Sequence, residues 1–299
     1  MFNTLINTNS GLDLAHIASL ADEMRSYHFG EVAVFHGKGE SESSLLIATH
    51  TDKASFVCTE LCTNGTAKAS LIGNLSTRSA ANSFVVSEKG ILAALTVSGS
   101  DESPIFSLDF GTEDLSETKK LVSVGDVFRP ENTVRRLSDT VASGAGLSVS
   151  APTLTLVRLC EALANDAPSS TVYVAFLKEG CHDFGPYSPV TIAFKPSSAV
   201  CVGAVDVDDA PTVKLGMGGA VRVSDRRFGS DKIISDALIE AGGVPAVLTK
   251  GSCAAANVQA VGVPASELDI PVKNLATHTE IIDLGDICQA AEILKRFCK

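Results

Sequence analysis

Histidine and carboxylate side chains occur where two apolar, strand-like runs end. The run SLLIAT (44–49) leads directly into His50, and Asp52 follows two positions later. A second apolar run begins at residue 199 and carries Asp206 near its end. Open α/β sheets place their sites at the carboxyl ends of strands, where imidazole and carboxylate groups act as metal ligands or as general acids and bases. The pattern therefore predicts a polar site at one edge of a sheet.

Helical and strand-like segments alternate in the two outer parts of the chain. Residues 11–27 have the apolar spacing of an amphipathic helix, and residues 152–166 place a proline in the first turn of another. The apolar run 171–180 is typical of a buried strand. This alternation predicts an α/β layered domain made of residues 1–53 and 131–299.

The segment 54–130 has a different pattern of apolar and polar residues from the rest of the chain. Short apolar runs such as SFVCTEL and NSFVVSEKG alternate with polar turns, and EDLSETKKLV is the one helical pattern expected among them. Turn signals about ten residues apart, without alternating helices, favour a small β-barrel or sandwich. We expect residues 54–130 to form a β-rich domain inserted into the α/β domain.

Composition excludes several kinds of partner. The chain has 299 residues, with 35 acidic and 24 basic ones and a formal charge of −11, and its basic residues form no run that could follow a phosphate backbone. Nucleic acid is therefore not an expected partner. No apolar stretch approaches the ~20 residues that span a bilayer, so no membrane is expected either. Eight cysteines without a C-x-x-C pair favour free thiols in a reducing compartment, and we expect a cytoplasmic protein.

Four stretches carry a resemblance to a known family: 45–56, 106–128, 213–225 and 261–286. They resemble the deblocking or glutamyl aminopeptidases, metallopeptidase family M42, which also includes cellulase-M-like homologues and consists of cytosolic two-metal exopeptidases. The resemblance implies a three-layer α/β aminopeptidase domain interrupted by a small, β-barrel-like dimerisation domain. It also implies a homo-oligomer, as a dimer or as a hollow shell of twelve subunits.

The family's site contains two metal ions that are bridged by a carboxylate and a water, with a glutamate as general base. By resemblance, His50 matches the first histidine ligand, and Asp52 matches the group that orients its ring. Asp206 matches the non-bridging aspartate ligand, and Glu179 matches a ligand of the second metal. A register shift of one residue would make Glu179 the general base but would remove it as a ligand.

Several other positions depart from the family's pattern. Ungapped matching puts Ala151 at the bridging aspartate, Lys178 at the general base and Ala276 at the last histidine ligand. His278 lies two residues after Ala276, and a two-residue step along a strand moves a side chain by about 6–7 Å, so His278 is a weak substitute. Cys253 stands where the family has an aspartate, and we expect it to be a small buried residue.

Two hypotheses follow from this comparison. In the first, the chain is a non-catalytic member with a structural or regulatory role, co-assembling with an active paralogue, and no cofactor is expected. In the second, it is a metal-dependent aminopeptidase or amidase in which zinc or cobalt is held by a rearranged site and peptides are the substrates. That site would recruit His50, Asp206 and Glu179, with His278 or His182 of the Cys181-His182-Asp183 segment, and Asp52 and Glu179 would be its catalytic candidates.

A third hypothesis concerns the glycine-containing segment 216–219. A phosphate-binding loop would need a lysine followed by serine or threonine after its glycines. The segment lacks that continuation, so a phosphate-binding module is the weakest of the three hypotheses.

Overall fold

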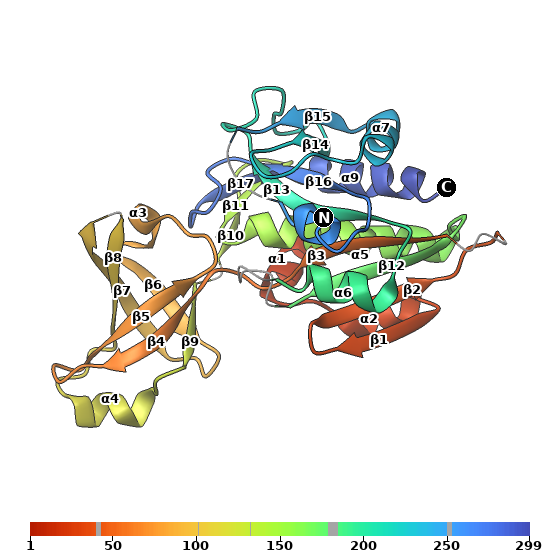
Figure 1. Cartoon of the computed structure of the whole chain (residues 1–299). Coiled ribbons are helices and arrows are strands. Elements are labelled where there is room, and N and C mark those ends of the chain that lie inside the picture. The colour runs from red at the N-terminus through yellow and green to blue at the C-terminus, as the bar shows by residue number, and fades with distance from the viewer. Residues whose placement is uncertain (40–42, 101, 132, 179–184, 250–252) are drawn as a thin grey trace.

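The computed structural model describes residues 1–39, 43–100, 102–131, 133–178, 185–249 and 253–299. A layered α/β body and a closed β-barrel lie side by side and are connected near the start and end of the barrel segment (Figure 1). The predicted fold class, an α/β domain with an inserted β-barrel, is confirmed.

The α/β body is built on a mixed sheet. In the part of the chain that the structure describes, this sheet has eight strands in the order β1 (Glu23–Tyr27), β2 (Gly30–Phe35), β12 (Thr171–Leu177), β3 (Ser44–His50), β13 (Ser198–Asp206), β16 (Ala265–Val272), β14 (Ala220–Ser224) and β15 (Val244–Val247). Strands β12, β3, β13 and β16 are parallel, whereas β2 and β14 are antiparallel to their inner neighbours. The carboxyl ends of the four parallel strands therefore meet at one edge.

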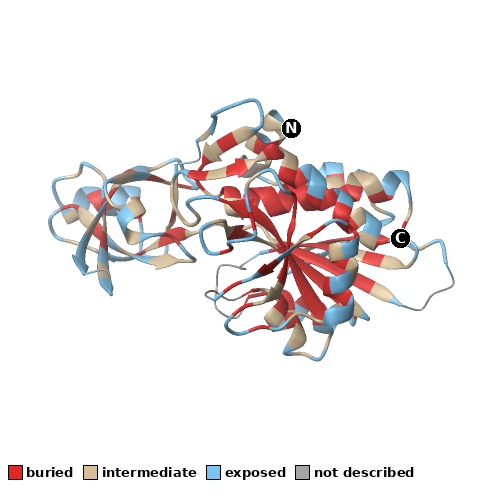
Figure 2. Cartoon of the chain, turned by 90° about the horizontal axis from the view of Figure 1, so that it is seen from above, coloured by how far each residue is buried: buried red, intermediate tan, exposed pale blue. Residues whose placement is uncertain are grey.

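Helices cover both faces of the sheet and complete the three layers. One face packs against α1 (Phe2–Ser10), α2 (Leu14–Leu20), α5 (Leu147–Asn165), α7 (Lys232–Glu240) and α9 (Leu284–Phe297). The other face packs against α6 (Tyr187–Phe194) and α8 (Ala255–Gln259). The buried residues form a continuous band along the sheet and the inner sides of these helices (Figure 2).

The central helix α5 differs from the predicted segment 152–166. It begins at Leu147, so Pro152 lies inside the helix rather than in its first turn. Proline lacks the N–H that would bond four residues back, but tertiary burial outweighs that loss because most of the helix packs in the core. By length and composition alone α5 is apolar enough to cross a membrane, yet 72% of its apolar window is buried within the fold, as in the core helices of many proteins.

The prediction of one helix over residues 11–27 is wrong in its second half. Helix α2 ends at Leu20, and Glu23–Tyr27 form the edge strand β1. The hydrogen-bond ladder of β1 with β2 pairs Glu23 with Val34 and Tyr27 with Gly30, in a tight hairpin. Gly30 has a φ of 138° that other residues rarely adopt. It permits the hairpin, which forms here in place of the helix that the apolar spacing predicts.

The barrel closes through six strands within its described residues. Their order is β4 (Ser55–Leu61), β5 (Thr66–Ile72), β8 (Ser103–Asp109), β7 (Leu92–Ser100), β6 (Ser83–Ser87) and β9 (Val127–Pro130). Its core contains Phe56, Phe128, Leu95 and Leu108, all fully buried. Helices α3 (Thr77–Ala80) and α4 (Leu115–Leu121) connect its strands.

A small sheet lies next to α5, and two hydrogen bonds connect the segment before its strand β17 (Glu280–Asp283) to the barrel. Strands β10 (Val134–Arg136) and β11 (Val141–Gly144) form this sheet together with β17. The N–H of Ser76, beside α3, donates to the carbonyl of Ala276 at 2.8 Å, and the N–H of His278 donates to Ser79 Oγ at 2.8 Å. The segment before β17 is thus held against the barrel.

Truncation of a core side chain on α5 tests its role as the centre of the body. Leu154→Ala removes a fully buried side chain, and we expect a loss of about 2–5 kcal/mol in the free energy of unfolding, measured by urea denaturation. Leu137→Ala is the matched control because Leu137 is 58% exposed, and its effect should stay within about 0.5 kcal/mol. Equal losses in the two variants would contradict this packing.

Candidate functional site

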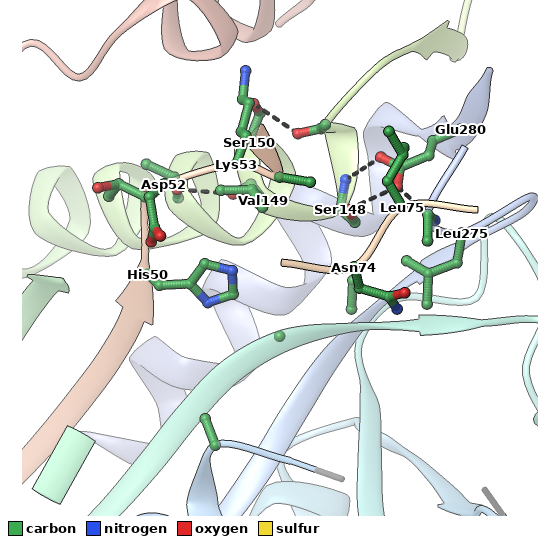
Figure 3. Close-up of a pocket in the computed structure, with 18 of the residues that line it drawn as sticks. His50, Asp52, Lys53, Asn74, Leu75, Ser148, Val149, Ser150, Leu275 and Glu280 are labelled. Carbon is green, nitrogen blue, oxygen red and sulfur yellow. Dashed lines mark hydrogen bonds between the residues drawn. The ribbon is translucent and has the colours of Figure 1, made fainter. Parts of the chain in front are cut away.

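A cavity of about 1200 Å³ opens at the carboxyl ends of β3 and β13, between the α/β body and the barrel. The loop after β3, the first turn of α5 and the segment before β17 meet around it (Figure 3). The barrel contributes Asn74, Glu88 and Arg129 to its lining. The edge predicted from the sequence therefore borders a cavity, and His50, Asp52 and Asp206 all lie on its lining.

His50 is the last residue of β3 and projects into the cavity (Figure 3). Its Nδ1 lies 3.2 Å from the hydroxyl oxygen of Tyr187, the first residue of α6. Burial lowers the pKa of His50, and the nearby charge of Asp52 opposes that shift. The imidazole is therefore neutral at neutral pH, and one of its two nitrogens already has a hydrogen-bond partner.

Asp206 ends β13 and uses both carboxylate oxygens within the protein. Its Oδ1 accepts a hydrogen bond from the N–H of Asp208 at 3.0 Å, and its Oδ2 accepts one from the N–H of Leu275 at 2.9 Å. These bonds fix the turn after β13 and tie it to the segment before β17. Asp206 thus has an internal structural role on the cavity wall.

Alanine occupies two positions where the resemblance implies metal ligands. Ala151 is fully buried in α5 and packs in the main hydrophobic core. Ala276 adopts a left-handed backbone with a φ of 61°, and its N–H donates to Glu280 Oε1 at 2.9 Å. A methyl group supplies no electron pair, so neither residue can bind a metal ion through its side chain.

The remaining predicted positions are dispersed. Lys178 Nζ lies 3.7 Å from Glu31 Oε1, and Lys178 does not line the cavity. His278 also lies off that lining; its ring Nε2 is buried without a hydrogen-bond partner, and burial lowers its pKa. Glu179 and the segment Cys181-His182-Asp183 lie outside the described residues.

The described residues do not fit a two-metal centre. Within the ranges that the structure describes, no three or more histidine, cysteine, aspartate or glutamate side chains are grouped so that they could hold a metal ion. Ala151, which ungapped matching puts at the bridging carboxylate, lies in the core, and Asp206 already accepts two backbone hydrogen bonds. The ligand roles of His50, Asp206, Glu179 and His278 stay predictions.

Glu280 is a site residue that sequence reasoning missed. It is 2% exposed, its Oε2 accepts from the N–H of Ser148 at 2.8 Å, and its Oε1 accepts from Ser148 Oγ at 2.8 Å and from the N–H of Ala276. Burial raises its pKa, while these donors favour the charged form. The carboxylate caps the first turn of α5, where the helix dipole also favours a negative charge (Figure 3).

Lys53 completes this end of the cavity. Its aliphatic chain lies over Gly146, where a Cβ would come within 2.6 Å of Lys53 Cδ. Gly146 has a φ of 70° and precedes α5, so a glycine there permits both the turn and the close approach. Burial lowers the pKa of Lys53 to about 8, and the charge of Glu280 opposes that shift.

A second missed feature is a buried cluster around Arg222 on β14. Its Nε donates to Asp269 Oδ2 at 2.8 Å, its Nη1 donates to Asp225 Oδ2 at 3.2 Å, and its Nη2 lies 3.9 Å from Glu267 Oε1. Glu267 and Asp269 are two residues apart on a strand, so they share one face. Two acids at that spacing in the otherwise uncharged run ASELDIPV were the signal available in the sequence.

The comparisons with known proteins agree with the geometry of the fold. A family model for M42 glutamyl aminopeptidase matches residues 30–293, which is most of the chain. The chain belongs to the M42 family. A relative from Acetivibrio thermocellus is 24% identical to this M42 chain over 304 residues, which cover 94% of the chain and 89% of the relative.

Solved structures show the same fold as this M42 chain. An aminopeptidase from the archaeon Desulfurococcus kamchatkensis superposes with a TM-score of 0.89 at 17% identity, covering 99% of this chain and 94% of that one. The TET1 peptidase of Pyrococcus horikoshii superposes with a TM-score of 0.82 at 19% identity, covering 95% and 91%. Its structure is described as assembling into a tetrahedron or a large octahedral shell.

Replacement of Glu280 by its amide tests the cap at the start of α5. In Glu280→Gln the NH₂ group must face either Ser148 N–H or Ala276 N–H, both of which are donors, so we expect a loss of about 1–3 kcal/mol in the free energy of unfolding. Glu88→Gln, on an exposed carboxylate of the same cavity, should cost at most about 1 kcal/mol. Urea denaturation compares them, and equal effects would refute the capping role.

Proposed function

We propose that this chain is a non-catalytic, cytoplasmic member of the M42 family that assembles with copies of itself or with an active paralogue and has a structural or regulatory role. The observation that carries the proposal is the set of side chains around the cavity: among the described residues, no three or more histidine, cysteine, aspartate or glutamate side chains are grouped so that they could hold a metal ion. Ala151, which ungapped matching puts at the bridging carboxylate, packs in the core and does not line the cavity.

The surroundings of the other family positions support the same proposal. Catalytic zinc sites ordinarily have three protein ligands per ion. In the described part of the chain, His50 and Asp206 remain on the cavity wall, but His50 bonds to Tyr187 and Asp206 bonds to backbone N–H groups. Lys178, which ungapped matching puts at the general base, has no carboxylate and lies 3.7 Å from Glu31 Oε1.

The alternative is a working metal-dependent aminopeptidase with a rearranged site. The observation that favours it is the large cavity, which keeps His50, Asp52 and Asp206 on one wall. In that case zinc or cobalt would be held by some of these residues together with Glu179, and peptides would be the substrates.

Self-association has its own support in the barrel. Phe84, Leu92 and Ile105 are 55%, 53% and 52% exposed on the neighbouring strands β6, β7 and β8. Phe84 and Leu92 lie near one another across the paired strands β6 and β7, and neighbouring exposed apolar side chains are typical of protein interfaces. We propose that this outer face of the barrel packs against a second copy, and the shells formed by the Pyrococcus horikoshii peptidase are consistent with such an assembly.

Metal titration with a turnover assay separates the two hypotheses about activity. Isothermal titration with Zn²⁺ and Co²⁺ should show no pair of tightly held ions per chain, and aminoacyl-anilides should not be hydrolysed, because the described residues supply no group of donors for a bridged pair. His50→Ala is the matched variant. Two tightly held ions with turnover, both lost in His50→Ala, would overturn the non-catalytic proposal and establish the alternative.

Charged residues on the outer face of the barrel should disrupt the assembly. Phe84→Glu combined with Leu92→Glu places two carboxylates in the proposed contact, and we expect a smaller particle by size-exclusion chromatography with light scattering. Leu137→Glu, at an exposed leucine outside the barrel, should leave the mass unchanged. An unchanged mass for the double variant would show that this face is not the contact.

A further inference from the structure

A lysine lines the cavity at the junction of the α/β body and the barrel. Lys53 lies in the loop between β3 and β4, beside the first turn of α5 (Figure 3). Its side chain runs close to Gly146, where a Cβ would come within 2.6 Å of Lys53 Cδ and 3.0 Å of Lys53 Cε. Packing along this backbone leaves Lys53 half-buried and restricts the directions that its amine can take. The amine is thus placed at the cavity wall.

Two groups of opposite charge accompany this amine, one from the body and one from the barrel. Glu280 on β17 accepts hydrogen bonds from Ser148 and Ala276, which hold its carboxylate in place. Arg129 on β9 lines the same cavity, and its Nη1 donates to Glu88 Oε1 at 2.9 Å. A guanidinium has five N–H donors, so this exposed ion pair leaves Arg129 able to bind a second carboxylate.

The charge state of Lys53 suits a nucleophile. Burial lowers the pKa of Lys53 to about 8, the charge of Glu280 opposes that shift, and the charge of Arg129 adds to it. About half of the amine is therefore unprotonated at pH 8, whereas an ordinary lysine is less than about 1% unprotonated there. Asp52, the neighbour of Lys53 in the chain, and Glu88 also line the cavity. An unprotonated amine can attack a carbonyl carbon, and burial beside a second cation is one way in which proteins activate a lysine.

We propose that Lys53 forms an imine with a small 2-oxo acid that enters the cavity, and that Arg129 binds the carboxylate of this ligand. The ligand class follows from the charges around the amine. Arg129 favours an anionic group on the carbonyl compound, and Glu280 stabilises the positive charge of the protonated imine. The cavity of about 1200 Å³ has room for such a molecule. The proposed site uses neither His50 nor Asp206, so it does not depend on whether the chain hydrolyses peptides.

The reaction consumes only the amine, the ketone and a proton. The unprotonated Nζ of Lys53 attacks the carbonyl carbon of the 2-oxo acid, so that a C–N bond forms while the π electrons of the C=O bond move to oxygen. A proton then moves from nitrogen to that oxygen and gives a carbinolamine. The nitrogen electron pair forms the C=N bond as hydroxide leaves, and hydroxide takes a proton from solvent. The products are the protonated imine and water.

Reductive trapping on the full-length protein tests the ligand class. Pyruvate and sodium cyanoborohydride are added at pH 8, and mass spectrometry of the peptides measures the reduced adduct at each lysine. We expect labelling of Lys53 to exceed that of the exposed Lys232 at least tenfold and to saturate with pyruvate concentration. Methyl pyruvate has the same ketone without the charge, so the ratio of Lys53 to Lys232 labelling should fall at least fivefold. Equal labelling of the two lysines by pyruvate, or an unchanged ratio with methyl pyruvate, would overturn the proposal.

Substitutions locate the site, with thermal denaturation as the check that each variant is folded. Lys53→Arg keeps the positive charge and Lys53→Met keeps the unbranched chain, and in both the saturable adduct should be lost. Arg129→Gln should lower pyruvate labelling of Lys53 at least fivefold and methyl pyruvate labelling less. Arg78→Gln, at an exposed arginine of the barrel outside the cavity lining, should behave like the wild type. A saturable adduct in whichever Lys53 variant folds, or equal pyruvate labelling in Arg129→Gln and Arg78→Gln, would overturn the assignment.

Discussion

The carboxylate of Glu280 connects the parts of the protein that meet at the cavity. It lies on β17, caps the first turn of α5 through Ser148 and holds the N–H of Ala276. The carbonyl of Ala276 in turn accepts from Ser76 of the barrel. One buried charge thus fixes the start of the central helix, the segment before β17 and the approach of the barrel. The shape of the cavity depends on this interaction because all three elements form its lining.

Hydrogen bonds within the protein occupy much of this cavity wall. Asp206 accepts two backbone N–H groups, and His50 pairs with Tyr187. Such contacts preorganise the side chains without an ion, whereas a metal centre requires carboxylates with free electron pairs directed at a common point. The same polar residues can therefore serve structure or metal binding, and their partners decide between the two.

Periodicity and resemblance predicted the fold class, because alternating apolar runs reflect burial directly. They also placed His50, Asp52 and Asp206 beside one cavity, since the ends of parallel strands share an edge. The parts of the prediction that were wrong or missing depend on contacts between residues that the local sequence pattern does not reveal. Residues 23–27 became a strand through pairing with β2, and α5 began at Leu147, several residues before Pro152. Glu280 could not be identified as a cap because Ser148 is far away in the sequence.

The Arg222 cluster shows that a buried carboxylate affects the protein differently from an exposed one. The chain has 35 acidic residues, and most acids of soluble proteins are solvated on the surface, where they favour solubility. Glu267 and Asp269 instead lie in a strand whose residues are all buried, and one guanidinium cannot balance them together with Asp225. A buried imbalance of charge costs free energy unless a proton or a ligand neutralises it. A proton supplies part of that neutralisation, because burial raises the pKa of Glu267 to about 7.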